Sequence, residues 1–148
     1  MRIYIDQSGK VEQTSKDTVV ALSNESERSI LIKASEKRLV EEVFRKAGKP
    51  EVFVYRTFTV LMYLLVRDEL EHISELLIDR EYVGKESTIK HYLLEVVRRT
   101  GKVLEKDCIG FTQVGKQSTC HKVAIETLRG RRKPDKVVTA RDVLRLVF

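Results

Sequence analysis

The sequence predicts an α/β protein with a mixed sheet, in which three antiparallel strands precede parallel strands and helices cover both faces. One observation is a set of three short apolar, β-branched segments near the start of the chain, separated by short polar connections. The other is the alternation of strand-like and helix-like segments after residue 74. The 148 residues suffice for one substantial core, so we expect a single domain over residues 1–148.

The first three elements are expected to be strands. Residues 2–6 (RIYID), 18–23 (TVVALS) and 29–33 (SILIK) share a β-branched and apolar composition. The stretches between them, residues 7–17 and 24–28, are polar and turn-like. Because a parallel pair needs a crossover of about a dozen residues or more, these short connections predict an antiparallel meander.

Two helices are expected next. Ser35 is a candidate cap for the first, and Gly48 suits the position just past its end. The apolar residues expected on one face of this helix are Leu39, Val40, Val43 and Phe44. Residues 51–57 have strand composition, yet Pro50 and the helical spacing that follows favour one long, mostly buried helix over residues 51–72.

The next elements are expected to alternate between strand and helix. Residues 75–79 (ELLID) form a compact apolar strand, and a helix follows Gly84 and closes at Gly101. Its expected buried face consists of Ile89, Leu93, Val96 and Val97. Residues 108–114 (CIGFTQV) then provide another strand.

Two helices complete the predicted order. Ser118 is a candidate cap for a helix over residues 119–129 that ends at Gly130. Thr139, followed three residues later by Asp142, is typical of the capping arrangement at the start of a last helix.

The balance of charge favours an anionic partner. Lys and Arg number 28 against 22 acids, which gives a net charge of +6. This excess favours nucleic acid, although basic charge is also a common device for solubility. Basic residues gather at residues 98–102 and 129–136, where they can neutralise phosphates or form an ordinary solvated face.

The apolar pattern and the two separate cysteines predict a cytoplasmic protein that does not enter a membrane. The longest apolar stretch, residues 58–66, is far shorter than the roughly 20 residues that a membrane span needs. Charges within the first six residues are not typical of a secretory signal. Cys108 and Cys120 stand apart and are expected to be reduced thiols.

Several common sites are not indicated. The sequence contains no GxGxxG, no Walker lysine loop and no GxSxG, so common nucleotide-binding and hydrolase classes are not predicted. His72 and His91 are too scattered to form a zinc site with the two cysteines, and we assign them no role.

Three segments resemble the active-site segments of the ribonuclease H-like superfamily. They are YIDQSGK at residues 4–10, LLIDREYVGKE at 76–86 and VGKQSTCHKVA at 114–124. The superfamily includes Holliday-junction resolvases, transposases and retroviral integrases, and the resemblance is to a prokaryotic branch rather than to one named enzyme. It implies a ribonuclease H-like mixed sheet in which the parallel first and fourth strands bring Asp6 and Asp79 together over a divalent cation.

The residue types suit that chemistry. Two carboxylates a few Å apart repel each other unless a cation lies between them, and Mg²⁺ or Mn²⁺ prefers such oxygen ligands. Glu81, two residues after Asp79, is a candidate ligand or supporting base. Glu86 and Glu12 are weaker candidates. The alternative is that each aspartate merely terminates its strand, as Asp often does at turns.

The third segment adds His121, Lys116 and Ser118. His121 lies in the first turn of a predicted helix, where the positive helix end favours neutral imidazole with a lone pair for a metal or a proton. Lys116 and the backbone around Ser118 are candidates for phosphate contact. The superfamily's last helix usually presents an acid, so His121 as the metal ligand is a departure. No acid is assigned to the helix that supplies a ligand in ribonuclease H itself.

We therefore predict a nuclease that depends on Mg²⁺ or Mn²⁺ and hydrolyses phosphodiesters in nucleic acid. Its predicted metal ligands are Asp6, Asp79 and His121, with Glu81 in a catalytic role and Lys116 and Ser118 at the phosphate. The alternative is a catalytically silent module that binds nucleic acid or serves in assembly. A PIN-like toxin nuclease fits less well, because a polar hairpin follows Asp6 where that family continues into a helix. DNA or RNA as substrate stays open, as does a homodimer of the kind that resolvases commonly form.

Overall fold

The computed structural model describes all of residues 1–148 and contains one six-stranded sheet in the order β5-β4-β1-β2-β3-β6. The strands are β1 (Arg2–Ser8), β2 (Thr18–Ser23), β3 (Glu27–Ile32), β4 (Glu75–Asp79), β5 (Ile109–Thr112) and β6 (Lys136–Val138). β1, β2 and β3 pair antiparallel, whereas β4, β5 and β6 join through parallel pairings. The predicted mixed α/β sheet is confirmed at this level.

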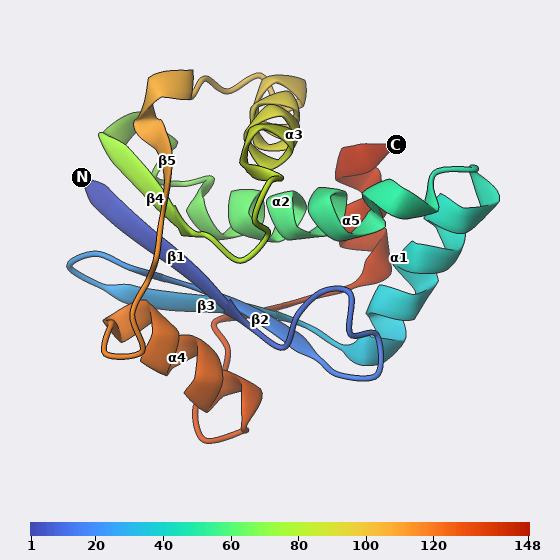
Figure 1. Cartoon of the computed structure of the whole chain (residues 1–148), viewed down its shortest axis with the longest axis horizontal. Coiled ribbons are helices and arrows are strands. Elements are labelled where there is room, and N and C mark those ends of the chain that lie inside the picture. Colours follow the sequence, from blue (N-terminus) through green and yellow to red (C-terminus); the bar gives the residue numbers. More distant parts are fainter.

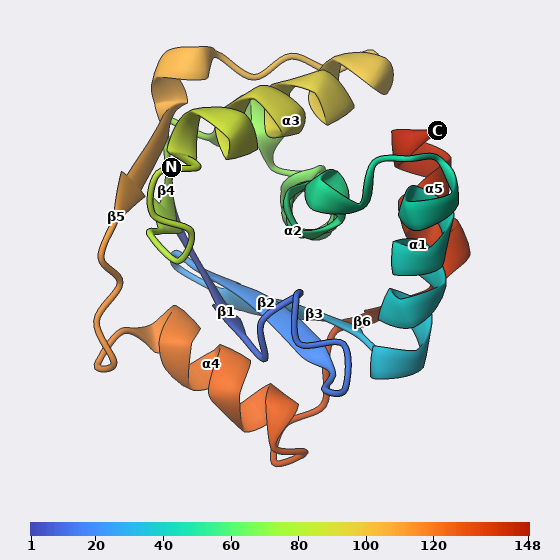
Figure 2. The same cartoon turned by 45° about the vertical axis from the view of Figure 1, so that its right-hand side comes forward.

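Helices cover both faces of the sheet, as Figures 1 and 2 show. They are α1 (Ala34–Lys46), α2 (Phe53–Val66), α3 (Glu86–Arg99), α4 (Thr119–Leu128) and α5 (Ala140–Val147). Three short 3₁₀ helices span Pro50–Val52, Leu70–His72 and Lys106–Cys108. α4 lies alone on one face, and the other four helices lie on the opposite side (Figure 2). None of the helices is long and apolar enough to cross a membrane.

The two faces have cores of very different size. A cluster of 32 buried residues packs between the sheet and α1, α2, α3 and α5. Under α4 there is only a cluster of four, formed by Val19, Ala21, Val123 and Ala124. These small and β-branched residues let α4 lie close to the middle of the sheet. The candidate site lies between α4 and this face of the sheet.

The first helix corrects two predictions. Its cap residue is Lys33 rather than Ser35, and no side chain caps it. Leu39 and Val43 are exposed, while the buried residues are Lys37, Val40 and Phe44. These three buried residues are three and four positions apart, as expected for one face of a helix, and the first of them is a lysine.

Most other boundaries follow the predictions. Residues 51–57 are helical, and 11 of the 14 residues of α2 are buried, so the expectation of a buried helix is confirmed. It is shorter than predicted, because α2 ends at Val66. Thr139 and Asp142 form the capping box at the start of α5. The strand β6 was not predicted, because its three residues follow directly on the charged stretch 129–135.

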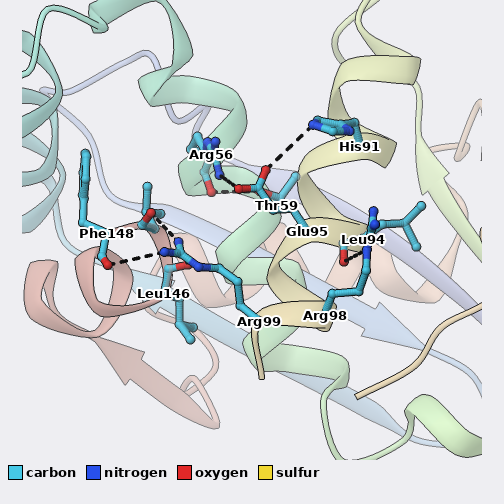
Figure 3. A network of polar contacts seen from close by, with 10 residues as sticks. Arg56, Thr59, His91, Leu94, Glu95, Arg98, Arg99, Leu146 and Phe148 are labelled. Carbon is cyan, nitrogen blue, oxygen red and sulfur yellow. Dashed lines mark hydrogen bonds and ion pairs between the residues drawn. The ribbon is translucent and has the colours of Figure 1, made fainter. Parts of the chain in front are cut away.

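Polar contacts join α3 to its neighbours on the helical side of the molecule (Figure 3). Arg56 of α2 lies 3.3 Å from Glu95 of α3. Arg99 of α3 donates hydrogen bonds to the main-chain carbonyls of Leu146 and Val147. These carbonyls have no partner within their own helix, so Arg99 satisfies the end of α5.

Candidate functional site

Asp6 and Asp79 lie at matching positions on adjacent parallel strands. β1 and β4 pair in parallel, with Ile5 opposite Ile78, and each aspartate is the next residue along its strand. Asp6 lies within β1, which runs two residues further than predicted, and Asp79 is the last residue of β4. Two carboxylates from distant parts of the sequence are thereby brought side by side.

Both aspartates are directed to the face that α4 covers. Ile5 and Ile78 belong to the large core on the opposite face. Because successive side chains of a strand point to opposite faces, the residues after them point toward α4. Asp6 pairs with Ala21 of β2, whose small side chain contacts the residues of α4. Asp6 is 4% exposed, so its carboxylate is largely removed from solvent.

α4 contributes His121 to the site. Ser118 caps this helix, as predicted, because its hydroxyl accepts a hydrogen bond from the backbone amide of His121 at 3.3 Å. This fixes the first turn of α4 and brings Nδ1 of His121 to 2.9 Å from Oδ2 of Asp6. When Asp6 is ionised, Nδ1 must donate the hydrogen bond in this contact. In the neutral ring, Nε2 then carries the lone pair.

The environment of Asp6 disfavours its negative charge. The pKa of Asp6 is raised to about 6, mainly by burial and to a smaller extent by the nearby charge of Asp79. The hydrogen bond from His121 and that from the Gln7 amide, at 2.8 Å, act in the opposite direction. The protein therefore holds a carboxylate where a second negative charge opposes its ionisation, and a bound cation would relieve this repulsion.

Asp79 and Glu81 form the other side of the site. Oδ1 of Asp79 accepts a hydrogen bond from the Val114 amide at 2.8 Å, which ties the end of β4 to the chain after β5. Glu81 follows the end of the strand, and its carboxylate lies 3.5 Å from Nζ of Lys10. Burial raises the pKa of Glu81, the charge and hydrogen bonding of Asp79 raise it further, and Lys10 lowers it.

The remaining predicted residues are more dispersed. Lys116 is exposed and has no hydrogen bond or ion pair from its side chain. The hydroxyl of Ser118 serves the helix cap. Glu86 accepts the Gly84 amide at the start of α3, and Glu12 accepts a hydrogen bond from the Tyr82 hydroxyl at 3.0 Å. The structure thus gathers Asp6, Asp79, Glu81 and His121.

The residues present fit a divalent cation held by two carboxylates, but they form no fuller cage. No group of three or more His, Cys, Asp and Glu side chains is arranged to hold a metal ion. Nδ1 of His121 is hydrogen-bonded to Asp6, so Nε2 is the nitrogen of this ring that is left to bind a metal ion. Mg²⁺ is commonly bound by one or two carboxylates and keeps several waters, and Asp6 and Asp79 supply two carboxylates at neighbouring positions on adjacent strands.

Three features of the site were not predicted from the sequence. Lys10, the Val114 amide and a chain of hydrogen bonds from Gln7 through Tyr82 to Glu12 all adjoin it. Glu12 could be suggested only as a residue folding back from the hairpin. These contacts depend on how loops fold over the strand ends, and a single sequence carries no periodic signal for that.

Comparison of the chain with family models, with curated proteins and with solved structures finds no match.

Proposed function

We propose that this protein is a metal-dependent nuclease of the ribonuclease H-like type, which hydrolyses phosphodiesters in nucleic acid. The observation that carries the proposal is the placement of Asp6 and Asp79 side by side on parallel strands, with His121 held against Asp6. A parallel first and fourth strand is also what the resemblance of the three segments implies for this superfamily.

Each residue has a distinct part in the proposal. Asp6 and Asp79 bind Mg²⁺ or Mn²⁺, which supplies charge neutralisation at the phosphate and an activated water. His121 fixes the orientation of the Asp6 carboxylate through the contact at 2.9 Å. Glu81 is the proton acceptor, because it lies beside Asp79 and its pKa is raised, mainly by burial and against the opposing charge of Lys10. Lys116 contacts a phosphate from the exposed loop before α4.

The distribution of charge supports a polyanionic substrate. Residues 113–136, which include α4, contain seven Lys and Arg and two acids, so five of the six net positive charges lie in this segment. Within this segment, α4 covers the face of the sheet to which Asp6 and Asp79 point. A basic surface beside paired carboxylates favours the approach of phosphates and makes binding salt-dependent. We propose a cytoplasmic location for this activity.

A cleavage assay tests the proposal. Labelled single-stranded, duplex, hybrid and branched DNA and RNA are incubated with the protein in Mg²⁺ or Mn²⁺. Cleavage by the wild type is expected to disappear in Asp6→Asn and in Asp79→Asn. Asp107→Asn is the matched control, because Asp107 is exposed and precedes β5 at the opposite end of the strand pair. Failure of the wild type on every substrate would count against a nuclease.

The second candidate is a catalytically silent module that binds nucleic acid or serves in assembly. It is favoured by the absence of a cluster of three metal-binding side chains and by the basic segment 113–136. This candidate predicts that Asp6→Asn and Asp79→Asn bind labelled nucleic acid as the wild type does and that none of the three proteins cleaves it. A homodimer is compatible with either candidate.

A further inference from the structure

The connection between β1 and β2 is long and is fixed by a buried lysine. Residues 9–17 link the two strands, whereas hairpin loops usually contain about 2–5 residues. Lys37 of α1 is fully buried. Its Nζ donates to the carbonyls of Lys10 and Gln13, at 3.2 and 2.7 Å, and lies 2.9 Å from the hydroxyl oxygen of Thr18. One ammonium group thus holds both arms of the loop.

Further contacts hold the loop against the body of the protein. Val11 is fully buried in the large core. Arg38 donates to the Thr14 carbonyl at 2.8 Å, and Asp17 accepts a hydrogen bond from the Ala34 amide at 2.9 Å. The loop lies beside α1 in both views of the molecule (Figures 1 and 2). α1 therefore fixes the loop along its length.

The opposite side of the loop reaches the candidate site. Nζ of Lys10 lies 3.5 Å from Glu81, and the Lys10 side chain is 51% exposed. Glu12 accepts a hydrogen bond from Tyr82, which in turn accepts one from Gln7, the residue next to Asp6. The loop therefore presents one cation and one acid beside the carboxylates, while its backbone is held from behind.

We propose that residues 9–17 form a preset wall of the candidate site, in which Lys10 contacts a phosphate of the substrate and Lys37 is the positioning residue. The role of Lys10 rests on the proposed function, whereas the ordering of the loop by Lys37 does not. Holding the loop in advance lowers the entropy that is lost when Lys10 engages a phosphate.

The chemistry of Lys37 supports a positioning role. A buried ammonium group is costly unless it is hydrogen-bonded, and here three acceptors surround it. The pKa of Lys37 is lowered to about 8, mainly by burial and to a smaller extent by Arg38, against the opposing charges of Asp17 and Glu12. An apolar side chain in the line of Val40 and Phe44 would fill the core more simply, but it would leave the loop carbonyls without donors.

Amide hydrogen exchange tests the positioning role. In Lys37→Met, the amides of residues 10–16 are expected to exchange about tenfold faster or more, while those of α4 stay protected. Lys16→Met is the matched control, because Lys16 is an exposed lysine of the same loop. If Met at position 37 prevents folding, Thr18→Val, which removes one acceptor, should give a smaller increase in the same amides. Unchanged exchange in the folded variants would overturn the role of Lys37.

Binding tests the role of Lys10. A fluorescein-labelled DNA oligonucleotide in EDTA is titrated at several salt concentrations with the wild type, Lys10→Met, Lys37→Met and Lys16→Met. The logarithm of the binding constant falls as the logarithm of the salt concentration rises. Loss of one phosphate contact makes this slope less steep by about 0.7–0.9 and weakens binding about threefold. We expect this in Lys10→Met and also in Lys37→Met, although Lys37 is fully buried.

The outcomes separate this inference from the proposed function. Equal losses in Lys10→Met and Lys16→Met would overturn the specific contact by Lys10. Binding by Lys37→Met with the wild-type salt slope would overturn the coupling between the two lysines. Absence of cleavage by the wild type would instead count against the nuclease, and it would leave the exchange and binding results standing.

Discussion

Nδ1 of His121 lies 2.9 Å from the carboxylate of Asp6, although 115 positions separate the two residues in the sequence. The contact joins the first turn of α4 to the middle of β1, and it forms on the face where the core contains only four buried residues. Because few apolar contacts hold α4 to the sheet, this hydrogen bond should contribute to the stability of the fold. It also lowers the pKa of the Asp6 carboxyl.

Loss of the His121 side chain should destabilise the protein. His121→Ala leaves one oxygen of Asp6, which is 4% exposed, without its partner, and burial then raises the pKa of Asp6 further. We expect a loss of about 1–3 kcal/mol in the free energy of unfolding at neutral pH. Urea unfolding measures it. His91→Ala is the control, since His91 is exposed and lies 3.8 Å from Glu95, and it should change stability by less than about 0.5 kcal/mol. Equal effects would show that the contact contributes nothing.

A divalent cation should stabilise the wild type more than Asp79→Asn. An Asn at position 79 retains an oxygen to accept the Val114 amide but removes the charge that raises the pKa of Asp6. Thermal unfolding is measured with and without Mn²⁺. A ligand present at 100 times its Kd adds about 2.7 kcal/mol to the wild type, and most of this gain should be absent in the variant. Asp107→Asn should retain the gain, and the same gain in Asp79→Asn would contradict a site between the two aspartates.

Stability should depend on pH through Lys37. In the folded protein burial lowers the pKa of Lys37 from 10.5 to about 8, so between these values the unfolded chain binds more protons. The stability of the wild type relative to Lys37→Met should therefore rise between pH 8 and 10.5, by about 3 kcal/mol in total, and stay level below pH 8. The charged groups that face Lys37 are Asp17, Glu12 and Arg38, all of which the variant retains. Chemical unfolding of both proteins at several pH values measures the difference, and parallel profiles would contradict it.

The sequence was informative where a pattern is local or periodic. The buried face of α3, the cap at Ser118 and the capping box at Thr139 were all predicted correctly, because each depends on residues within a few positions of one another. The parallel adjacency of Asp6 and Asp79 was not readable from such patterns, and it was expected from the resemblance of three segments. The structure places the two residues accordingly.

The errors have physical causes that are equally specific. Lys37 lies on the buried face of α1, but a lysine is not counted as apolar in a hydrophobic pattern. The predicted buried face was therefore drawn from the apolar residues and included Leu39 and Val43, which are exposed. β6 consists of three residues that pair with one edge of β3, so its existence depends on a partner that is remote in sequence. Loop contacts such as Lys10 with Glu81 depend on tertiary structure alone.

The geometry at Gly9 gives a further test of the preset loop. Gly9 has φ of 71°, and a Cβ atom there would lie 2.1 Å from the carbonyl oxygen of Asp17, at the opposite end of the same loop. Gly9→Ala must therefore separate the two ends of the loop as well as adopt a left-handed conformation.

Gly84→Ala is a matched control, since Gly84 has φ of 84° but no atom within 4 Å of the added Cβ. The control should lose about 1 kcal/mol of stability from its backbone conformation alone, and Gly9→Ala should lose at least about 2 kcal/mol. Urea unfolding measures both, and amide exchange of residues 10–16 should increase only in Gly9→Ala. Equal losses would mean that the close approach of Gly9 and Asp17 does not hold the loop, because both variants share the cost of positive φ and only one has the clash.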